Sequence, residues 1–293
     1  MKYVITTPTG KIGSRVTRNL LQAGKDVTLL VRDKEKVAGF AEQGATVIEG
    51  DLEDETYVVN STREADVLFW LTPPNYAIDD FRQYQNRLGE NVAKAVRANN
   101  IEYVVNLSST GAHLAFGNGP VNGLYDIEQR LDAVATNLTH LRPTAFYENL
   151  LGSLDTIKNA GALFLPVNGD ATVPMIATSD IGDIASDVLL KLDWTGKRAL
   201  HLWGPKETTH NEVAIALTGV LERKVNHVEV SDEQAHEALK GMGLTEDMTR
   251  QYIELYNSFS AGHFCSGIDQ PELRGKTTFE QWARDVFRPA YSA

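Results

Sequence analysis

The stretch that most constrains the fold of this chain is residues 3–13, which read YVITTPTGKIG. Tyr3–Thr6 is a short run of aromatic and β-branched residues typical of a buried strand, and the residues after it are typical of a turn. Beyond the turn an apolar residue recurs every fourth position, at Ile12, Val16 and Leu20. This spacing places the three side chains on one face of a helix, which we expect to begin near Lys11.

The turn has the chemistry of a phosphate-binding loop. Gly10 and Gly13 let the backbone turn tightly and let the helix lie close to the strand, so unpaired N–H groups at the positive end of the helix dipole point outward. Dinucleotide-binding fingerprints carry a further glycine where this chain has Thr7. The context compensates, because a second strand at 27–31 completes a βαβ unit. We therefore predict a dinucleotide site that includes both glycines.

Strands and helices continue to alternate along the first half of the chain. The patterns predict strands at 46–49, 67–71, 103–107 and 139–141, and helices at 34–43, 78–98 and 124–135. Such alternation is typical of an α/β fold with a Rossmann-type, doubly wound parallel sheet. Ligands of these sheets bind at the carboxyl ends of the strands, so we expect a cleft there.

From Arg142 onward the alternation loosens, and we expect a second lobe. Residues 1–150 form the predicted Rossmann domain, to which 178–203 returns as a helix with Asp180 at its N-cap and a strand at 199–203. Residues 151–177 and 204–293 form the predicted substrate-binding lobe, which is smaller and mostly helical. Its helices are expected at 211–221, 232–240, 246–259 and 278–287, and a strand at 226–230.

Composition excludes several classes of function. The net charge of −11 and the lack of a Lys/Arg cluster oppose binding to nucleic acid. No apolar run is long enough to span a bilayer, and the first strand leaves no room for a secretory signal, so we expect a cytoplasmic protein without a membrane partner. Cys265 is the only cysteine, which fits a reducing compartment. The seven histidines have no metal-binding spacing, so we expect no metal site.

Five segments together resemble a known family. They are TPTGKIG at 7–13, LVRD at 30–33, GDLED at 50–54, LRPTAFYENL at 141–150 and SDIGDIA at 179–185. In order and spacing these segments resemble the NmrA-like branch of the atypical short-chain dehydrogenases, over nearly the whole chain. That branch includes NAD(P)H-dependent quinone oxidoreductases, triphenylmethane and azo-dye reductases, and catalytically silent NADP-sensing regulators.

The resemblance implies a sheet of about seven strands and a substrate held between the two lobes. It also implies which residues hold the cofactor. Thr7, Thr9, Gly10, Lys11 and Ile12 would hold the pyrophosphate, Asp51 and Leu52 would flank the adenine, and Leu71, Thr72 and Pro73 would line the path to the nicotinamide.

The chain departs from the short-chain dehydrogenase active site. That site needs a tyrosine and, four residues later, a lysine that lowers the pKa of the phenol. Here Tyr125 is followed at that spacing by Gln129, whose neutral amide cannot lower the pKa of the phenol as the lysine does. Gln129 is still a candidate for contact with the cofactor. Tyr125, Ser108 and Ser109 remain candidates for hydrogen bonds to a substrate. A hydride can still pass directly to an electrophilic acceptor, which requires positioning more than acid catalysis.

Four further residues are candidates for the substrate site. Phe146 and Tyr147 follow a strand near the expected nicotinamide, where they either stack on the ligands or pack in the core. Asn149, in the same segment, and Tyr76, in the loop after strand 67–71, are expected to face the cleft.

The end of the second strand predicts NADP(H) as the cofactor. An NAD site places a carboxylate there for the ribose 2′-hydroxyl, whereas an NADP site places a cation there for the 2′-phosphate. Arg32 occupies that end, and Lys36 lies one helical turn further on. Asp33 is the competing residue, because it either turns inward as in an NAD site or caps the next helix.

Two functions fit these residues. The first is an NADPH-dependent oxidoreductase that reduces a small planar electrophile such as a quinone, and the second is a catalytically silent NADP(H) sensor that acts through a protein partner. They differ in the space beside the nicotinamide, which is open and apolar in the enzyme and filled by Tyr76, Phe146 or Tyr147 in the sensor. An isomerase or epimerase is disfavoured because it needs the missing lysine. The patterns leave both a monomer and a homodimer open.

Overall fold

The computed structural model describes all 293 residues and contains an eight-stranded sheet whose neighbouring strands are all parallel. The strand order is β13-β10-β6-β5-β4-β1-β2-β3. The strands are β1 (Lys2–Thr6), β2 (Asp26–Val31), β3 (Thr46–Glu49), β4 (Val67–Leu71), β5 (Tyr103–Leu107), β6 (Asn137–Pro143), β10 (Lys197–Trp203) and β13 (Leu273–Arg274). The predicted doubly wound parallel sheet is confirmed, with β13 as a strand that the sequence did not indicate.

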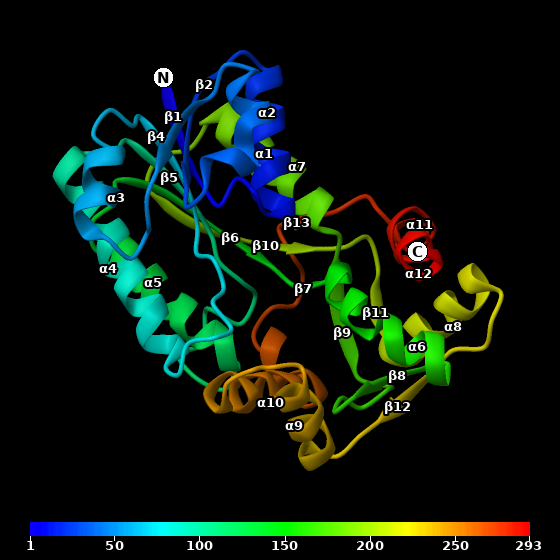
Figure 1. Ribbon diagram of the computed structural model, residues 1–293. Helices are drawn as coiled ribbons and strands as arrows, with labels where there is room; N and C mark the ends of the chain where they lie inside the picture. The colour runs from blue at the N-terminus through cyan, green and yellow to red at the C-terminus, as the bar shows by residue number, and fades with distance from the viewer.

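Helices cover both faces of the sheet (Figure 1). Helices α1 (Lys11–Gln22) and α7 (Thr178–Lys191) pack together on one face, and α3 (Glu55–Ser61), α4 (Phe81–Asn99) and α5 (Asn122–Asp132) pack on the other. Side chains alternate between the two layers along each strand. In β1, Ile5 packs with the residues of α1, and its neighbour Val4 packs with those of α4. Burial on both faces explains the near-continuous apolar strands in the sequence.

The C-terminal lobe contains two small sheets, the helices around them and a core of its own. One sheet has the order β11-β9-β7 and the other pairs β12 with β8. The elements are β7 (Ala145–Phe146), the 3-10 segment η3 (Tyr147–Ser153), α6 (Leu154–Ala160), β8 (Ala162–Leu165), β9 (Thr172–Ile176), β11 (Glu207–Thr209), α8 (His210–Leu221), β12 (Asn226–Glu229), α9 (Asp232–Gly241), α10 (Glu246–Ser260), η4 (His263–Cys265), α11 (Phe279–Trp282), the π-helical η5 (Ala283–Phe287) and α12 (Arg288–Ser292). No helix in the chain combines the length and the apolarity needed to cross a membrane.

Helix α10 lies across the carboxyl ends of the first domain's strands rather than far out in its own lobe (Figure 1). It packs against the 3-10 turn η2 (Gly119–Val121) that precedes α5. Two hydrogen bonds hold its start: the Phe81 N–H donates to the Asp247 carboxylate at 3.0 Å, and the Thr245 hydroxyl donates to the Ile78 carbonyl at 2.9 Å. The C-terminal lobe therefore supplies one wall of the space at the carboxyl ends of the strands.

The structure corrects two local predictions. Ala177, not Asp180, is the N-cap of α7, and the Asp180 carboxylate instead accepts hydrogen bonds from the Thr277 N–H and hydroxyl at 2.8 and 2.7 Å. Asp180 therefore fixes a segment nearly a hundred residues away, which no local pattern reveals. The stretch predicted as one helix at 34–43 is a 3-10 turn, η1 (Lys34–Val37), followed by the single turn α2 (Ala38–Ala41).

Candidate functional site

The turn between β1 and α1 builds an open helix end. Thr7 has a left-handed φ of 51°, the conformation for which the fingerprint uses glycine. No side chain caps α1 at Gly10, so the N–H groups of the first turn keep no side-chain partner. A Cβ atom on Gly13 would lie 2.2 Å from the Thr7 carbonyl oxygen, so only glycine lets the helix approach the strand this closely. The uncapped dipole end fits an anionic pyrophosphate.

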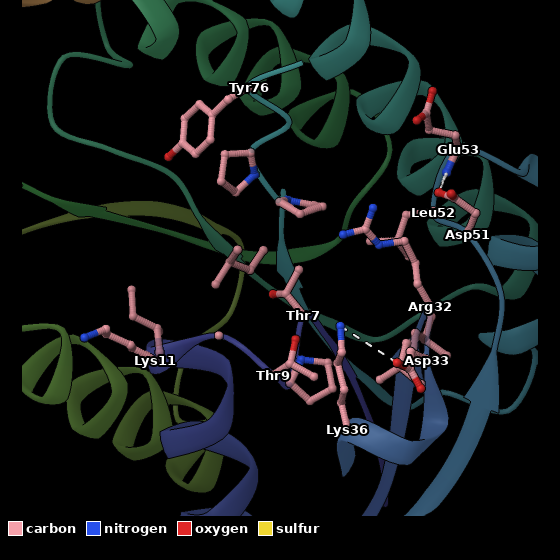
Figure 2. A pocket seen from close by; sticks show the side chains of 18 of the residues that line it. Thr7, Thr9, Lys11, Arg32, Asp33, Lys36, Asp51, Leu52, Glu53 and Tyr76 are labelled. Carbon is pink, nitrogen blue, oxygen red and sulfur yellow. Dashed lines mark hydrogen bonds and ion pairs between the residues drawn. The ribbon is translucent and has the colours of Figure 1, made fainter. Parts of the chain in front are cut away.

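A cavity of about 580 Å³ adjoins this helix end, at the carboxyl ends of β1, β2 and β4 (Figure 2). These strands flank the point where the strand order reverses, which is where open α/β sheets bind their ligands. Of the residues expected at the cofactor, Thr7, Thr9, Gly10, Lys11, Ile12, Arg32, Lys36, Asp51, Leu52, Leu71 and Pro73 line it. Their part in binding remains a prediction.

The charges in this first cavity favour an anionic ligand. Its carboxylates are already engaged: Asp51 accepts the Glu53 N–H at 2.9 Å, Glu53 pairs with Arg87 at 3.0 Å, and Glu148 accepts the Thr178 N–H at 3.0 Å. Lys11 and Arg32, by contrast, make no ion pair or side-chain hydrogen bond within the chain. Lys11 and Arg32 are therefore available to pair with the charged groups of an anionic ligand.

The end of β2 carries the competing pair of Arg32 and Asp33. The Asp33 carboxylate accepts the Glu35 N–H at 3.0 Å, which caps the following turn, and lies 3.8 Å from the Lys36 ammonium. The exposed Arg32 points into the cavity with its guanidinium free, as Figure 2 shows. Asp33 therefore serves as a cap, and the arrangement suits a 2′-phosphate better than a bare ribose.

Several residues that the sequence did not single out hold the rim of the first cavity in place. The Asn91 amide donates to the carbonyls of Leu52 and Glu53 at 2.9 and 3.0 Å. The Tyr84 hydroxyl donates to the Pro73 carbonyl at 3.2 Å, and burial raises the pKa of Tyr84 to about 12, so this phenol stays protonated. Both side chains project from α4, whose apolar stripe in the sequence indicates packing only.

A second cavity, of about 320 Å³, lies beside the first and is largely apolar. Fourteen of its 22 lining residues are hydrophobic, and helix α10 with the segment after it supplies one aromatic wall. The rings of Tyr76 and Tyr252 lie 6.4 Å apart, and those of Phe259 and Phe264 lie 4.8 Å apart. Five residues line both cavities: Ile12, Leu71, Pro74, Tyr76 and Phe146. The two cavities therefore meet at the end of β4.

The second cavity also contains four of the sequence candidates that the first does not. Ser108 and Ser109, at the end of β5, and Asn149, in η3, all line it, as does Thr72. The Ser109 hydroxyl donates to the Thr110 carbonyl at 2.8 Å. Ser108 is 5% exposed and its hydroxyl has no partner.

Four candidates line neither cavity. Tyr147 is 2% exposed and packs against Phe279 and Trp282 in the core of the C-terminal lobe, which is the second of the two positions considered for it. Gln129 is exposed near the end of α5, and Tyr125 is half-buried on the same helix. Gly13 does not contact the cavity but allows the close approach of α1 to the strand.

Comparison with known proteins agrees with this architecture. The chain is 29% identical over 282 residues to the NAD(P)H azoreductase of Xenophilus azovorans, with 94% of each chain covered. The triphenylmethane reductase of Citrobacter sp., solved with NADP(H), superposes with a TM-score of 0.79 at 20% identity, covering 96% of this chain and 98% of that one. An NADPH-dependent quinone oxidoreductase of Escherichia coli, solved with NADPH, gives a TM-score of 0.78 at 20% identity, covering 98% and 100%. The NmrA-like family model matches residues 2–283, and the chain belongs to the NmrA-like family.

Proposed function

We propose that the protein is an NADPH-dependent oxidoreductase that passes a hydride to a small planar electrophile such as a quinone. The observation that carries this proposal is the junction of the two cavities at Ile12, Leu71, Pro74, Tyr76 and Phe146. A charged cavity of dinucleotide size and an apolar cavity of small-molecule size share these residues. These shared residues would hold a nicotinamide ring beside the second cavity, and hydride transfer requires such proximity of the two reactants.

The first cavity supports NADPH as the reductant. The open end of α1 would hold the pyrophosphate, and the free Arg32 would meet the 2′-phosphate with paired charged hydrogen bonds. Asp33 is engaged as a cap and as a partner of Lys36, so it does not offer the carboxylate that an NAD site uses. The name of the NADPH-dependent quinone oxidoreductase agrees with this choice, and that of the NAD(P)H azoreductase is compatible with it.

The reaction needs little acid catalysis from the protein. The bound reduced nicotinamide supplies a hydride, which carries two electrons, and a proton from water then completes the conversion of a quinone to a hydroquinone. The chain orients the acceptor against the shared residues and keeps bulk water from it with the aromatic wall of α10. Tyr125 and Gln129 line neither cavity, which fits a site without the tyrosine–lysine pair.

The open second cavity favours the enzyme over the silent NADP(H) sensor. A sensor has no need of an apolar space beside the nicotinamide, and such a space is costly to leave unfilled. Tyr147, one of the side chains that would fill this space, instead packs in the core of the C-terminal lobe. Tyr76 is 47% exposed at the rim and leaves the space open.

The proposal is tested by following NADPH absorbance with a panel of quinones, azo dyes and enones. We expect NADPH oxidation that depends on the acceptor and that is slower with NADH at equal concentration. Calorimetry on the same protein measures cofactor binding separately. Tight NADPH binding without oxidation by any acceptor would favour the sensor instead.

A further inference from the structure

The second cavity has no charged side chain in its lining. None of its 22 residues is Asp, Glu, Lys, Arg or His, whereas the first cavity contains charges of both signs. The aromatic wall adds the rings of Tyr76, Tyr252, Phe259 and Phe264. Offset stacking on such faces favours a planar conjugated ligand. The cavity therefore offers stacking and apolar contact, but no counter-ion.

From this lining we propose that the site takes an uncharged aromatic acceptor, rejects anionic ones, and holds the acceptor's polar end with the Ser108 hydroxyl. The proposal rests on the proposed function, since it names the class of acceptor that the same site reduces. It separates neutral quinones and neutral azo compounds from their carboxylated and sulfonated relatives.

Rejection of anions follows from desolvation. An ionised oxygen that enters this cavity loses part of its hydration and finds no cationic side chain in the lining in exchange, and an unpaired buried charge is strongly unfavourable. The net charge of −11 opposes the approach of an anion as well. A neutral ring system meets neither penalty and gains the apolar contact.

Ser108 is singled out by the hydrogen bonds of its neighbours. The hydroxyls of Ser109 and Thr144 donate to backbone carbonyls, of Thr110 at 2.8 Å and of Pro174 at 2.5 Å, and the Thr72 hydroxyl accepts the Trp70 indole N–H at 3.0 Å. Among these hydroxyls, only that of Ser108 is buried and has no partner; the Gln85 carbonyl oxygen is also buried without one, but it can only accept a hydrogen bond. Its backbone N–H donates to the Leu141 carbonyl at 2.8 Å, which fixes its position. A carbonyl or azo group of the acceptor would satisfy this hydroxyl.

The charge of the acceptor is tested by calorimetry on protein saturated with NADP⁺, in which no turnover takes place. The matched pair is 2-methoxy-1,4-naphthoquinone, which is neutral, and 2-hydroxy-1,4-naphthoquinone, which is ionised at neutral pH. We expect the ionised quinone to bind about 100-fold more weakly, in line with the cost of an unpaired buried anion. A difference of less than about tenfold, equivalent to 1.4 kcal/mol, or no binding of the neutral quinone, would overturn the proposal.

A cation placed at the rim should relax the discrimination. Asn149 is exposed and lines the second cavity, so Asn149→Lys should reduce the ratio between the two quinones severalfold. Asn226→Lys, on the exposed surface of β12 and away from both cavities, makes the same change in net charge and should leave the ratio unaltered. Equal effects of the two variants would show that global charge, not the lining, sets the preference.

The role of Ser108 is tested by Ser108→Ala, with Ser186→Ala as the control, because Ser186 is a buried serine of α7 that lines neither cavity. Loss of one ligand hydrogen bond should weaken binding of the neutral quinone by roughly three- to tenfold in Ser108→Ala and by less than about twofold in Ser186→Ala. Ser108→Ala should keep or raise the melting temperature, because the hydroxyl that it removes is unsatisfied in the free protein. Unchanged quinone affinity would refute the role of Ser108.

Failure of this inference and failure of the proposed function give different results. Equal affinity for both quinones with normal NADPH oxidation would refute the preference for an uncharged acceptor and leave the oxidoreductase proposal intact. Strong discrimination in the NADP⁺ complex without NADPH oxidation removes only the oxidoreductase proposal.

Discussion

The two cavities differ both in how they are built and in how they would bind. Eight of the 23 residues of the first are hydrophobic, against 14 of the 22 of the second, and only the first carries charges. The first is centred on one βαβ unit and the turns that follow its neighbouring strands. The second combines the ends of β4 and β5 with α10, more than 100 residues further along the chain. The first cavity is thus built mainly on a local motif, whereas the second is a product of tertiary assembly.

This contrast assigns different forces to the two ligands. In the first cavity, a helix dipole and free cations act on fixed phosphate charges, so single residues should control affinity strongly. In the second, affinity comes from apolar area and stacking spread over many side chains. Substitutions that separate these two modes of binding therefore test the comparison.

The largest expected effect is on the charged side of the comparison. Arg32→Ala should weaken NADPH binding by roughly ten- to a thousandfold, because charged hydrogen bonds to the 2′-phosphate contribute about 1.5–3 kcal/mol each. NADH binding should change little. Lys34→Ala is the matched control, because Lys34 is an exposed neighbour that removes the same charge but lines neither cavity. Calorimetric titration of both cofactors measures the effect, and equal losses in the two variants would contradict a direct contact.

A second effect concerns the lobe that supplies the wall of the second cavity. Burial, together with a smaller effect of the nearby His227, lowers the pKa of His210 to about 4. In the unfolded chain His210 takes up a proton near pH 6.5. Its contribution to the free energy of unfolding is therefore fully present above that pH and is lost as the pH falls toward 4. The loss should reach about 3 kcal/mol and grow no further below that range. Urea unfolding of the wild type and of His210→Gln at several pH values measures this loss. If the free energy of unfolding depends on pH in the variant as it does in the wild type, His210 is excluded as the cause.

A third effect tests the close contact that makes the first cavity possible. Gly13→Ala places a Cβ atom 2.2 Å from the Thr7 carbonyl oxygen, so α1 must move away from β1, at a cost of about 1–3 kcal/mol of stability and with weaker NADPH binding. Gly10→Ala meets its nearest atom at 3.6 Å and should change stability by less than about 0.5 kcal/mol. Denaturant melts of the two variants compare them. Equal stabilities would show that helix and strand are not tightly apposed.

The smallest expected effect is on catalysis by Tyr125. If the acceptor needs no internal acid, Tyr125→Phe should leave kcat within about tenfold of the wild-type value, because general acid catalysis contributes about 100-fold or more. Steady-state kinetics with the best quinone of the panel measures this, and NADPH calorimetry serves as the control. A thousandfold loss of kcat with intact cofactor binding would require a proton donor after all.

The sequence predicts the first cavity well because its signals are local. The strands at 67–71 and 103–107 and the helix from Lys11 lie as expected, since apolar period and turn chemistry fix them without distant contacts. Thr7 adds a lesson, because the turn keeps the glycine-like φ of 51° although the glycine is absent. The turn therefore keeps its left-handed backbone conformation even where threonine replaces glycine. The strand and helix around the motif are more informative than the motif's exact residues.

The second cavity could be predicted only in part. The sequence predicts that Tyr76 and Asn149 face the cleft, and both line this cavity, but the wall from α10 depends on tertiary packing. Phe146 and Tyr147 are adjacent, yet one lines both cavities and the other lies in a core, because the chain changes from β7 to the 3-10 segment η3 between them. The aromatic residues of α10 read as an amphipathic stripe, which indicates a buried face but not what it faces. Asp180 shows the same limit, since it bonds to Thr277 rather than to its own helix end.

The most direct test of the two-cavity account is a crystal structure of the protein with NADP⁺ and 2-methoxy-1,4-naphthoquinone. The account predicts the nicotinamide ring against Leu71 and Phe146, and the quinone against Tyr252 and Phe259 in the second cavity. Nicotinamide C4 should then lie about 3–3.5 Å from the quinone atom that receives the hydride. A quinone bound outside the second cavity, or a nicotinamide ring turned away from the shared residues, would contradict it.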